Sequence, residues 1–102
     1  MEEKDLHRFI AEHFGRKEEL RKLREECLEL AEAVDDYLRE GDTPETYAHL
    51  IEEMADVGIV TDNLSCLLVC REALRVKRKE KIARTIERIR TGYYEDKEKK
   101  NA

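Results

Sequence analysis

The chain has 102 residues, of which 44% are charged and 40% hydrophobic, and its net charge is −5. Four glycines and one proline are too few for a β-sandwich or barrel, which needs a turn about every ten residues, so the composition predicts an all-α fold. The negative net charge disfavours indiscriminate nucleic-acid binding. The length predicts one domain, residues 1–94. The charged tail that follows, residues 95–102, is expected to be disordered.

The first two predicted helices span Glu2–Phe14 and Arg16–Glu40. They are separated by glycine, a residue typical of helix C-termini; Gly15, Gly41 and Gly92 each stand where a periodic segment stops. Apolar residues of the second helix recur in steps of three and four, at Leu20, Leu23, Cys27, Leu30, Val34 and Leu38. This spacing predicts one core-facing stripe.

The third helix is predicted to start at Thr43 and Pro44, which read as an N-cap and a first helical residue. Its stripe comprises Leu50, Met54, Val57, Thr61, Leu64 and Leu68. The break before the fourth helix is placed near residues 70–72, because helices that pack in a bundle tend to match in length. The fourth helix carries an apolar stripe at Ile82, Ile86, Ile89 and Tyr93.

The third helix is apolar on more than one face. Apolar or small residues also cover the side opposite its stripe, at Ile51, Ala55, Gly58, Ile59, Cys66, Val69 and Cys70. A helix that is apolar all round is buried all round, which a unit of four helices cannot achieve alone. The sequence therefore predicts a four-helix-bundle-type unit completed by homo-oligomerisation, with the third helix at the centre of the oligomer.

Two pairs of carboxylates occupy the second and third helices, Glu26 with Glu29 and Glu53 with Asp56. Residues three apart share a helix face, and packing of the two apolar stripes would bring these pairs together at the edge of the core. Carboxylates that converge repel one another unless a cation neutralises them, and hard divalent ions prefer oxygen ligands. The alternative is a solvated acidic face, which is common in a chain with 25 acidic residues.

These two motifs resemble the signature of the MazG-like nucleotide pyrophosphohydrolases, an all-α family. The local sequences of residues 25–33 and 51–57 are similar to the family's, and residues 81–89 resemble the basic helix that closes such domains. The resemblance implies cleavage of nucleoside triphosphates to monophosphate and pyrophosphate. It also implies a four-helix unit that forms a homodimer or homotetramer. It implies Mg²⁺, with Mn²⁺ as a substitute, held by Glu26, Glu29, Glu53 and Asp56. Many relatives carry glutamine near the position of Glu19, where this chain departs from the family.

A basic stripe lies on the predicted fourth helix, formed by Lys77, Lys81, Arg84 and Arg88 at steps of four, three and four. Such a row suits a triphosphate, since arginine binds phosphate oxygens bidentately and lysine binds as a point charge. A solvated surface helix is the alternative. Asn63, seven residues after Asp56, is interpreted either as a contact to sugar or base or as a buried hydrogen-bonding residue.

The remaining motifs indicate no other chemistry. The first five residues are acidic, unlike a signal peptide, and the longest uncharged apolar run, Leu64–Cys70, is far below the about 20 residues of a membrane span. Three cysteines without an export signal favour free thiols in the cytoplasm. Cys66 and Cys70 are interpreted as small buried hydrophobic residues, and Cys27 as part of the core stripe.

The sequence therefore predicts a cytoplasmic, Mg²⁺-dependent nucleotide pyrophosphohydrolase that clears or adjusts nucleotide pools. Water attacks phosphorus, Glu29 and Glu53 are the expected catalytic carboxylates, and Asn63, Lys81, Arg84 and Arg88 the expected substrate contacts. Two alternatives stay open: a phosphoribosyl-ATP pyrophosphohydrolase-like enzyme, and a non-catalytic helical interaction module.

Overall fold

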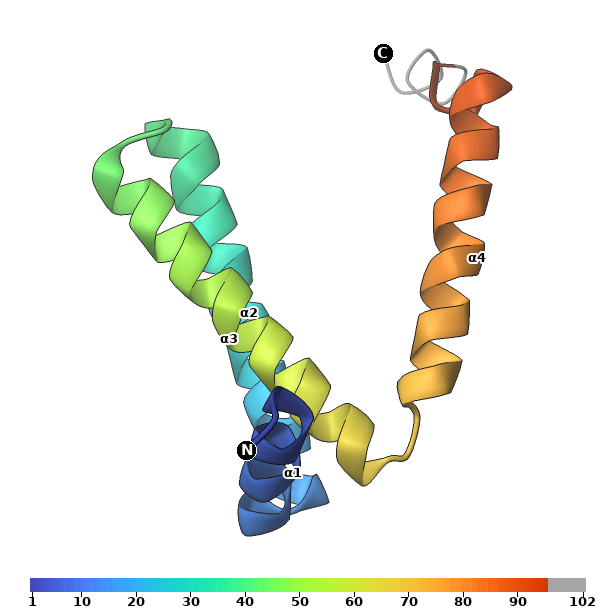
Figure 1. The fold of residues 1–102 in the computed structure, drawn as a ribbon. Coiled ribbons are helices and arrows are strands. Elements are labelled where there is room, and N and C mark those ends of the chain that lie inside the picture. The colour runs from blue at the N-terminus through green and yellow to red at the C-terminus, as the bar shows by residue number, and fades with distance from the viewer. Residues whose placement is uncertain (96–102) are drawn as a thin grey trace. The chain divides into compact units, whose positions relative to one another are not determined.

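The computed structural model describes residues 1–95. It contains four helices of 12 residues or more, α1 (Glu3–Phe14), α2 (Arg16–Glu40), α3 (Pro44–Leu67) and α4 (Arg71–Arg90), and no strand among the described residues (Figure 1). The predicted all-α class is confirmed. The tail predicted for residues 95–102 lies, except for Glu95, outside the described residues.

The chain forms two compact units, Met1–Cys70 and a second that begins at Arg71. The first holds α1, α2 and α3, and the second holds α4.

The predicted helix boundaries at Thr43 and the first two glycines agree with the structure. The Thr43 hydroxyl accepts a hydrogen bond from the Thr46 amide at 3.1 Å, and the Thr46 hydroxyl accepts one from the Thr43 amide at 2.9 Å. This capping box satisfies amides that would otherwise lack partners at the start of α3. Gly15 and Gly41 follow α1 and α2 with φ of 85° and 87°, which residues with a Cβ rarely adopt.

The end of α3 and the end of α4 differ from the prediction. The break lies at residues 68–70 rather than 70–72, and Val69 turns the chain there with a φ of 51°. Leu68 is therefore outside α3, not part of its stripe. α4 ends at Arg90, and Gly92 adopts a φ of 74°, so Tyr93 lies outside the helix that was predicted to include it.

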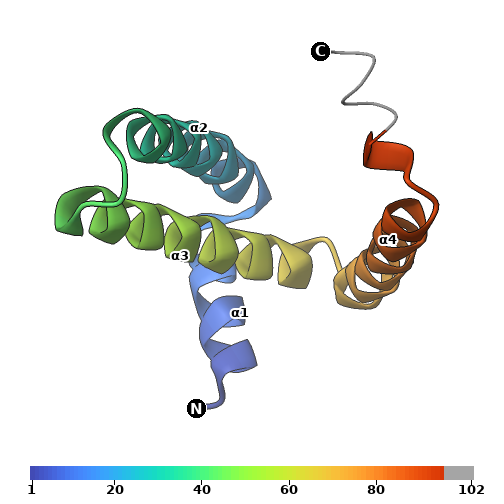
Figure 2. The ribbon, with the colours of Figure 1, turned by 90° about the horizontal axis from the view of Figure 1, so that it is seen from above.

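In the first unit, α2 and α3 form an antiparallel hairpin, and α1 lies near the end where α2 starts and α3 finishes (Figures 1 and 2). The facing sides of the hairpin are partly polar. On α2 they carry the buried Glu19 and Ala33 with Glu26 midway between them, and on α3 the buried Glu53 and Val60. These residues are seven apart, which is two helical turns.

The predicted packing of apolar stripes against each other is only partly correct: Leu23 and Leu30 of α2 are half-buried and Leu64 of α3 is buried, but the other α2 members are exposed. In α2, the exposed members are Leu20, Cys27, Val34 and Leu38. They are exposed because the side of α2 that faces α3 carries Glu19, Glu26 and Ala33 instead. Among the described residues, the buried hydrophobic side chains are Ala11, Ala33, Val60 and Leu64. Cys66 and Cys70 are half-buried free thiols. The single chain thus has a very small apolar core.

The second unit consists mainly of α4, which has no buried residue. It carries nine lysines and arginines and three glutamates, and it ends in basic residues that complement the negative end of the helix dipole. None of the helices in the described part of the chain combines the length and the apolar character needed to cross a membrane.

Candidate metal centre

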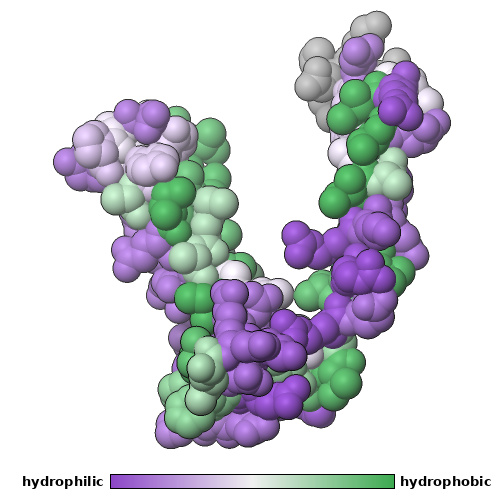
Figure 3. Space-filling view, viewed as in Figure 1, coloured by the Kyte–Doolittle hydropathy of each residue, from purple (hydrophilic) through white to green (hydrophobic). Residues whose placement is uncertain are grey.

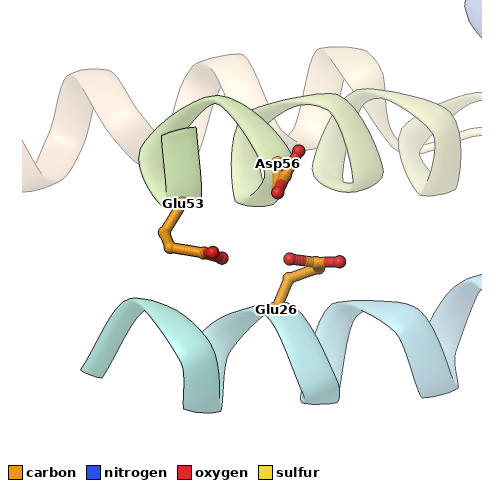
Figure 4. Close-up of side chains that lie close together, drawn as sticks. All are labelled: Glu26, Glu53 and Asp56. Atoms are coloured by element: carbon orange, nitrogen blue, oxygen red, sulfur yellow. The ribbon is translucent and has the colours of Figure 1, made fainter. Parts of the chain in front are cut away.

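Three of the four predicted metal ligands meet between α2 and α3. Glu26 projects from α2 toward Glu53 and Asp56 on α3 (Figure 4), and one oxygen from each carboxylate lies within 4.8 Å of the others. Glu53 and Asp56 share one face of α3 because they are three residues apart. The antiparallel hairpin supplies Glu26 from the opposite side. This geometry confirms that the two acidic motifs converge.

Two of these carboxylates are shielded from water, Glu53 almost fully and Glu26 in part. Glu53 is 7% exposed. One oxygen of Glu53 and one oxygen of Glu26 are buried with no hydrogen-bond partner among the described residues. A buried polar atom without a partner costs about 1–3 kcal/mol, and more if it is charged. The arrangement therefore needs either protons or a cation.

The raised pKa values of Glu26 and Glu53 also indicate that the cluster needs protons or a cation. Burial, followed by repulsion from Glu29 and Asp56, raises the pKa of Glu26 from 4.5 to about 7. Burial and then Glu29 raise the pKa of Glu53, while His49, whose Nε2 lies 3.6 Å from the Glu53 carboxylate, opposes this rise. Both carboxylates thus hold their protons more tightly than an isolated glutamate does. A divalent cation would displace those protons.

Glu29 lies beside this triad. Its carboxylate interacts with both Glu26 and Glu53, by repulsion and by a hydrogen bond when one partner is protonated. Unlike Glu53, Glu29 is exposed. The cluster therefore has four carboxylates: the inner pair Glu26 and Glu53, the half-buried Asp56, and the outer Glu29, which meets solvent.

The donor set suits a hard divalent ion. Mg²⁺ and Mn²⁺ bind carboxylate oxygens, and Mg²⁺ usually keeps several water molecules and binds through a few carboxylates. The cluster in Figure 4 offers oxygen atoms alone, without a cysteine ligand. The residues present therefore fit such an ion, and the unpartnered oxygens of Glu26 and Glu53 would gain a partner.

Asn63 belongs to a second polar network in the first unit. Its amide nitrogen donates to Glu19 at 3.4 Å, and its amide oxygen lies 2.8 Å from Nδ1 of His7 on α1. Asn63 is 2% exposed and Glu19 is fully buried. The buried hydrogen-bonding interpretation of Asn63 is the one the structure shows. A contact between Asn63 and a nucleotide stays a prediction, and it would require one of these hydrogen bonds to be exchanged.

Sequence reasoning assigned no role to His7 and did not place Glu19 in the interior. No motif links them to Asn63, because His7 is 56 positions and Glu19 is 44 positions away along the chain. One signal was present: Glu19 lies seven residues before Glu26, and residues seven apart share a helix face. Because Glu26 faces α3, Glu19 on the same face of α2 also lies in the interface.

The basic residues lie on α4, in the second unit. Lys77, Lys81 and Arg84 line one pocket together with Glu80, so three of the four residues of the predicted stripe share one surface of that helix. Lys77 pairs with Glu80 at 2.9 Å. The Arg88 guanidinium lies over the Tyr93 ring, 4.6 Å from its centroid. In the second unit, Lys81 and Arg84 thus lie together on one face of α4.

No protein-family model matches the chain, and neither the curated proteins nor the solved structures include one with significant similarity to it.

Proposed function

We propose that this protein is a Mg²⁺-dependent nucleoside triphosphate pyrophosphohydrolase acting in nucleotide-pool clearance. The observation that carries the proposal is the convergence of Glu26, Glu53 and Asp56, with two buried oxygens that have no partner. A cluster that only solvated the surface would expose its carboxylates. This one holds them inside a helix interface, at an energetic cost that a cation would offset.

The resemblance of the two acidic motifs to the MazG-like family supplies the reaction class. Glu26, Glu53 and Asp56 would hold Mg²⁺, with Glu29 as an additional outer ligand. When bound there, Mg²⁺ supplies charge neutralisation for the phosphates and makes a water molecule more acidic. Glu29 would accept a proton from the attacking water, a role supported by its exposure and by its interaction with the inner pair.

The polyphosphate would be bound by cations of α4. Lys81 and Arg84 share one face of that helix, and they provide a point charge and a bidentate fork for phosphate oxygens. Arg88 is the third candidate, and its stacking on Tyr93 fixes the position of its guanidinium. The products would be a nucleoside monophosphate and pyrophosphate.

The direct test is pyrophosphate release from a panel of nucleoside triphosphates, with phosphoribosyl-ATP included, in the presence of Mg²⁺ or Mn²⁺. We expect activity on at least one nucleoside triphosphate and its loss on chelation. If phosphoribosyl-ATP is the one compound cleaved, it replaces nucleoside triphosphates as the proposed substrate. If no compound in the panel is cleaved by the folded protein, the enzyme proposal fails and an interaction module is the better account.

A matched pair of variants makes the assay specific to the site. Glu53→Gln removes one inner carboxylate, whereas Glu52→Gln changes the neighbouring residue, which is exposed. We expect Glu53→Gln to be inactive and Glu52→Gln to retain full activity.

A further inference from the structure

Few apolar side chains attach α1 to the α2–α3 hairpin. Ala11 is the buried residue of α1, and Ile10 is half-buried. The larger apolar side chains of this helix are exposed, namely Leu6, Phe9 and Phe14. The space-filling view shows hydrophobic surface in the region of α1 (Figures 1 and 3). Because burial of apolar side chains is the main force that holds a helix in place, α1 is only weakly attached.

His7 makes the polar contact between α1 and α3. Its Nδ1 lies 2.8 Å from Oδ1 of Asn63, and its Nε2 lies 3.7 Å from the carboxylate of Asp62. The amide nitrogen of Asn63 donates to Glu19 on α2, so the amide oxygen is the end that accepts a hydrogen bond from His7. His7 is therefore linked through Asn63 to both helices of the hairpin.

Glu19, at the other end of this link, makes the closed arrangement costly. The side chain is fully buried, and its Oε1 has no hydrogen-bond partner among the described residues. Its Oε2 accepts from Asn63 at 3.4 Å, which is long for a hydrogen bond. A buried carboxylate with so few hydrogen bonds is less stable than the same carboxylate in water. Movement of α1 away from the hairpin would let water reach Glu19 and would remove this penalty.

A single residue, Gly15, connects α1 to α2. Its φ is 85°, and a Cβ built there would meet no atom within 4 Å. Glycine also adopts many backbone conformations at little cost. The connection can therefore change its dihedral angles without a steric clash at this position, as a hinge requires.

We propose that α1 is a lid that opens about Gly15 and is held closed by His7. Opening exchanges the hydrogen bond of His7 and the packing of α1 for hydration of the Glu19 carboxylate. These gains and losses offset one another, so both states are accessible. Glu19 lies seven residues, about 10 Å, before Glu26 on the same face of α2. The lid therefore controls the access of water and solutes to the hairpin two helical turns from the candidate metal centre.

The first experiment is amide hydrogen exchange of the unaltered protein, followed by mass spectrometry of peptides from each helix. The amides of residues 7–14 should exchange together and at least about tenfold faster than those in the middle of α2 and α3, because a lid opens without global unfolding. Their exchange should also depend little on low concentrations of urea, since opening exposes little surface. If α1 exchanges at the rate and with the urea dependence of α2 and α3, the proposal is overturned.

Two histidine variants test the latch. His7→Ala and His13→Ala make the same change in the same helix, but His13 is exposed and His7 contacts α3. His7→Ala should accelerate the exchange of α1 about tenfold, the effect of losing one hydrogen bond. His13→Ala should change it less than about twofold, as expected for an exposed position. Equal effects of the two substitutions would exclude His7 as the latch.

Glu19→Gln tests the cause of opening. The amide has nearly the shape of the carboxylate but carries no charge, so covering it costs less. α1 should then exchange at least about threefold more slowly than in the parent, opposite in direction to His7→Ala. Glu25→Gln, at an exposed position of α2, should have no such effect. Faster exchange in Glu19→Gln would show that the carboxylate holds α1 closed, which contradicts the proposal. None of these measurements depends on pyrophosphohydrolase activity.

Discussion

Glu26 on α2 and Glu53 on α3 face each other across the centre of the hairpin, and each buries one carboxylate oxygen that has no hydrogen-bond partner among the described residues. The facing of two acids inside a helix interface is unfavourable for stability, because burial and mutual repulsion both penalise the charged forms. The raised pKa of both groups expresses this penalty.

The first prediction is a pH dependence of stability without metal. The pKa of Glu26 is about 7 in the folded chain against an ordinary 4.5. Between these values the folded state binds more protons than the unfolded state, so the free energy of unfolding should fall as pH rises from 4.5 to about 7. Glu53 should act in the same direction. Urea denaturation with chelator at pH 5 and pH 8 measures the difference.

The control for this prediction is a pair of neutral substitutions. Glu26→Gln should flatten the pH dependence and leave the protein at least as stable as the parent above pH 7. Glu25→Gln, at an exposed position, should leave the slope unchanged. A parent protein that becomes more stable as pH rises would contradict the assignment of raised pKa values to this cluster.

The second prediction concerns metal binding. Mg²⁺ should release protons from the cluster at pH 6.5, because binding requires ionised carboxylates. Calorimetric titration in buffers of different ionisation enthalpy gives the number of protons released. Glu53→Gln should abolish the heat of binding, and Glu52→Gln should preserve it. Tight binding of Mg²⁺ by folded Glu53→Gln would exclude Glu53 as a ligand.

The third prediction separates the cations of α4 from the metal centre. Arg84→Ala should preserve Mg²⁺ binding but lower kcat/KM, since a hydrogen bond to a charged phosphate is worth about 1.5–3 kcal/mol. The expected loss is roughly ten- to a hundredfold, with partial recovery in Arg84→Lys because the bidentate fork is absent. Steady-state kinetics provide the measurement. Parent-like kinetics in both Arg84→Ala and Lys81→Ala would leave α4 without a role in substrate binding.

The fourth prediction concerns the network of His7, Glu19 and Asn63. Asn63→Ala removes two hydrogen bonds and leaves the buried Glu19 without its donor, so it should destabilise the first unit by about 2–4 kcal/mol. His7→Ala should cost less, because it removes one hydrogen bond and leaves the donation from Asn63 to the buried Glu19 in place. The double variant should be less destabilised than the sum of the two, since the residues share a contact. Urea denaturation of the parent, the two single variants and the double variant at one pH measures this coupling. Strictly additive losses in the free energy of unfolding would contradict direct coupling between His7 and Asn63.

The sequence by itself determined the class of fold and most helix boundaries. Residue spacing in steps of three and four, the Thr43–Pro44 start and the glycines after α1 and α2 are local signals, because capping and backbone conformation depend on adjacent residues. The convergence of the acidic motifs was also predictable, since Glu53 and Asp56 occupy one face of α3 and the short connection after Gly41 makes α2 and α3 antiparallel neighbours.

Only the tertiary structure decided which side of α2 faces α3. The sequence pattern favoured the apolar stripe through Leu20 and Val34, whereas the structure places Glu19, Glu26 and Ala33 in the interface. Rotation of a helix about its axis is fixed by all of its neighbours, so a periodic pattern identifies a stripe without identifying its partner. The same rotation buries Glu19 beside Asn63, half-buries Glu26 opposite Glu53, and leaves Leu20 and Val34 exposed.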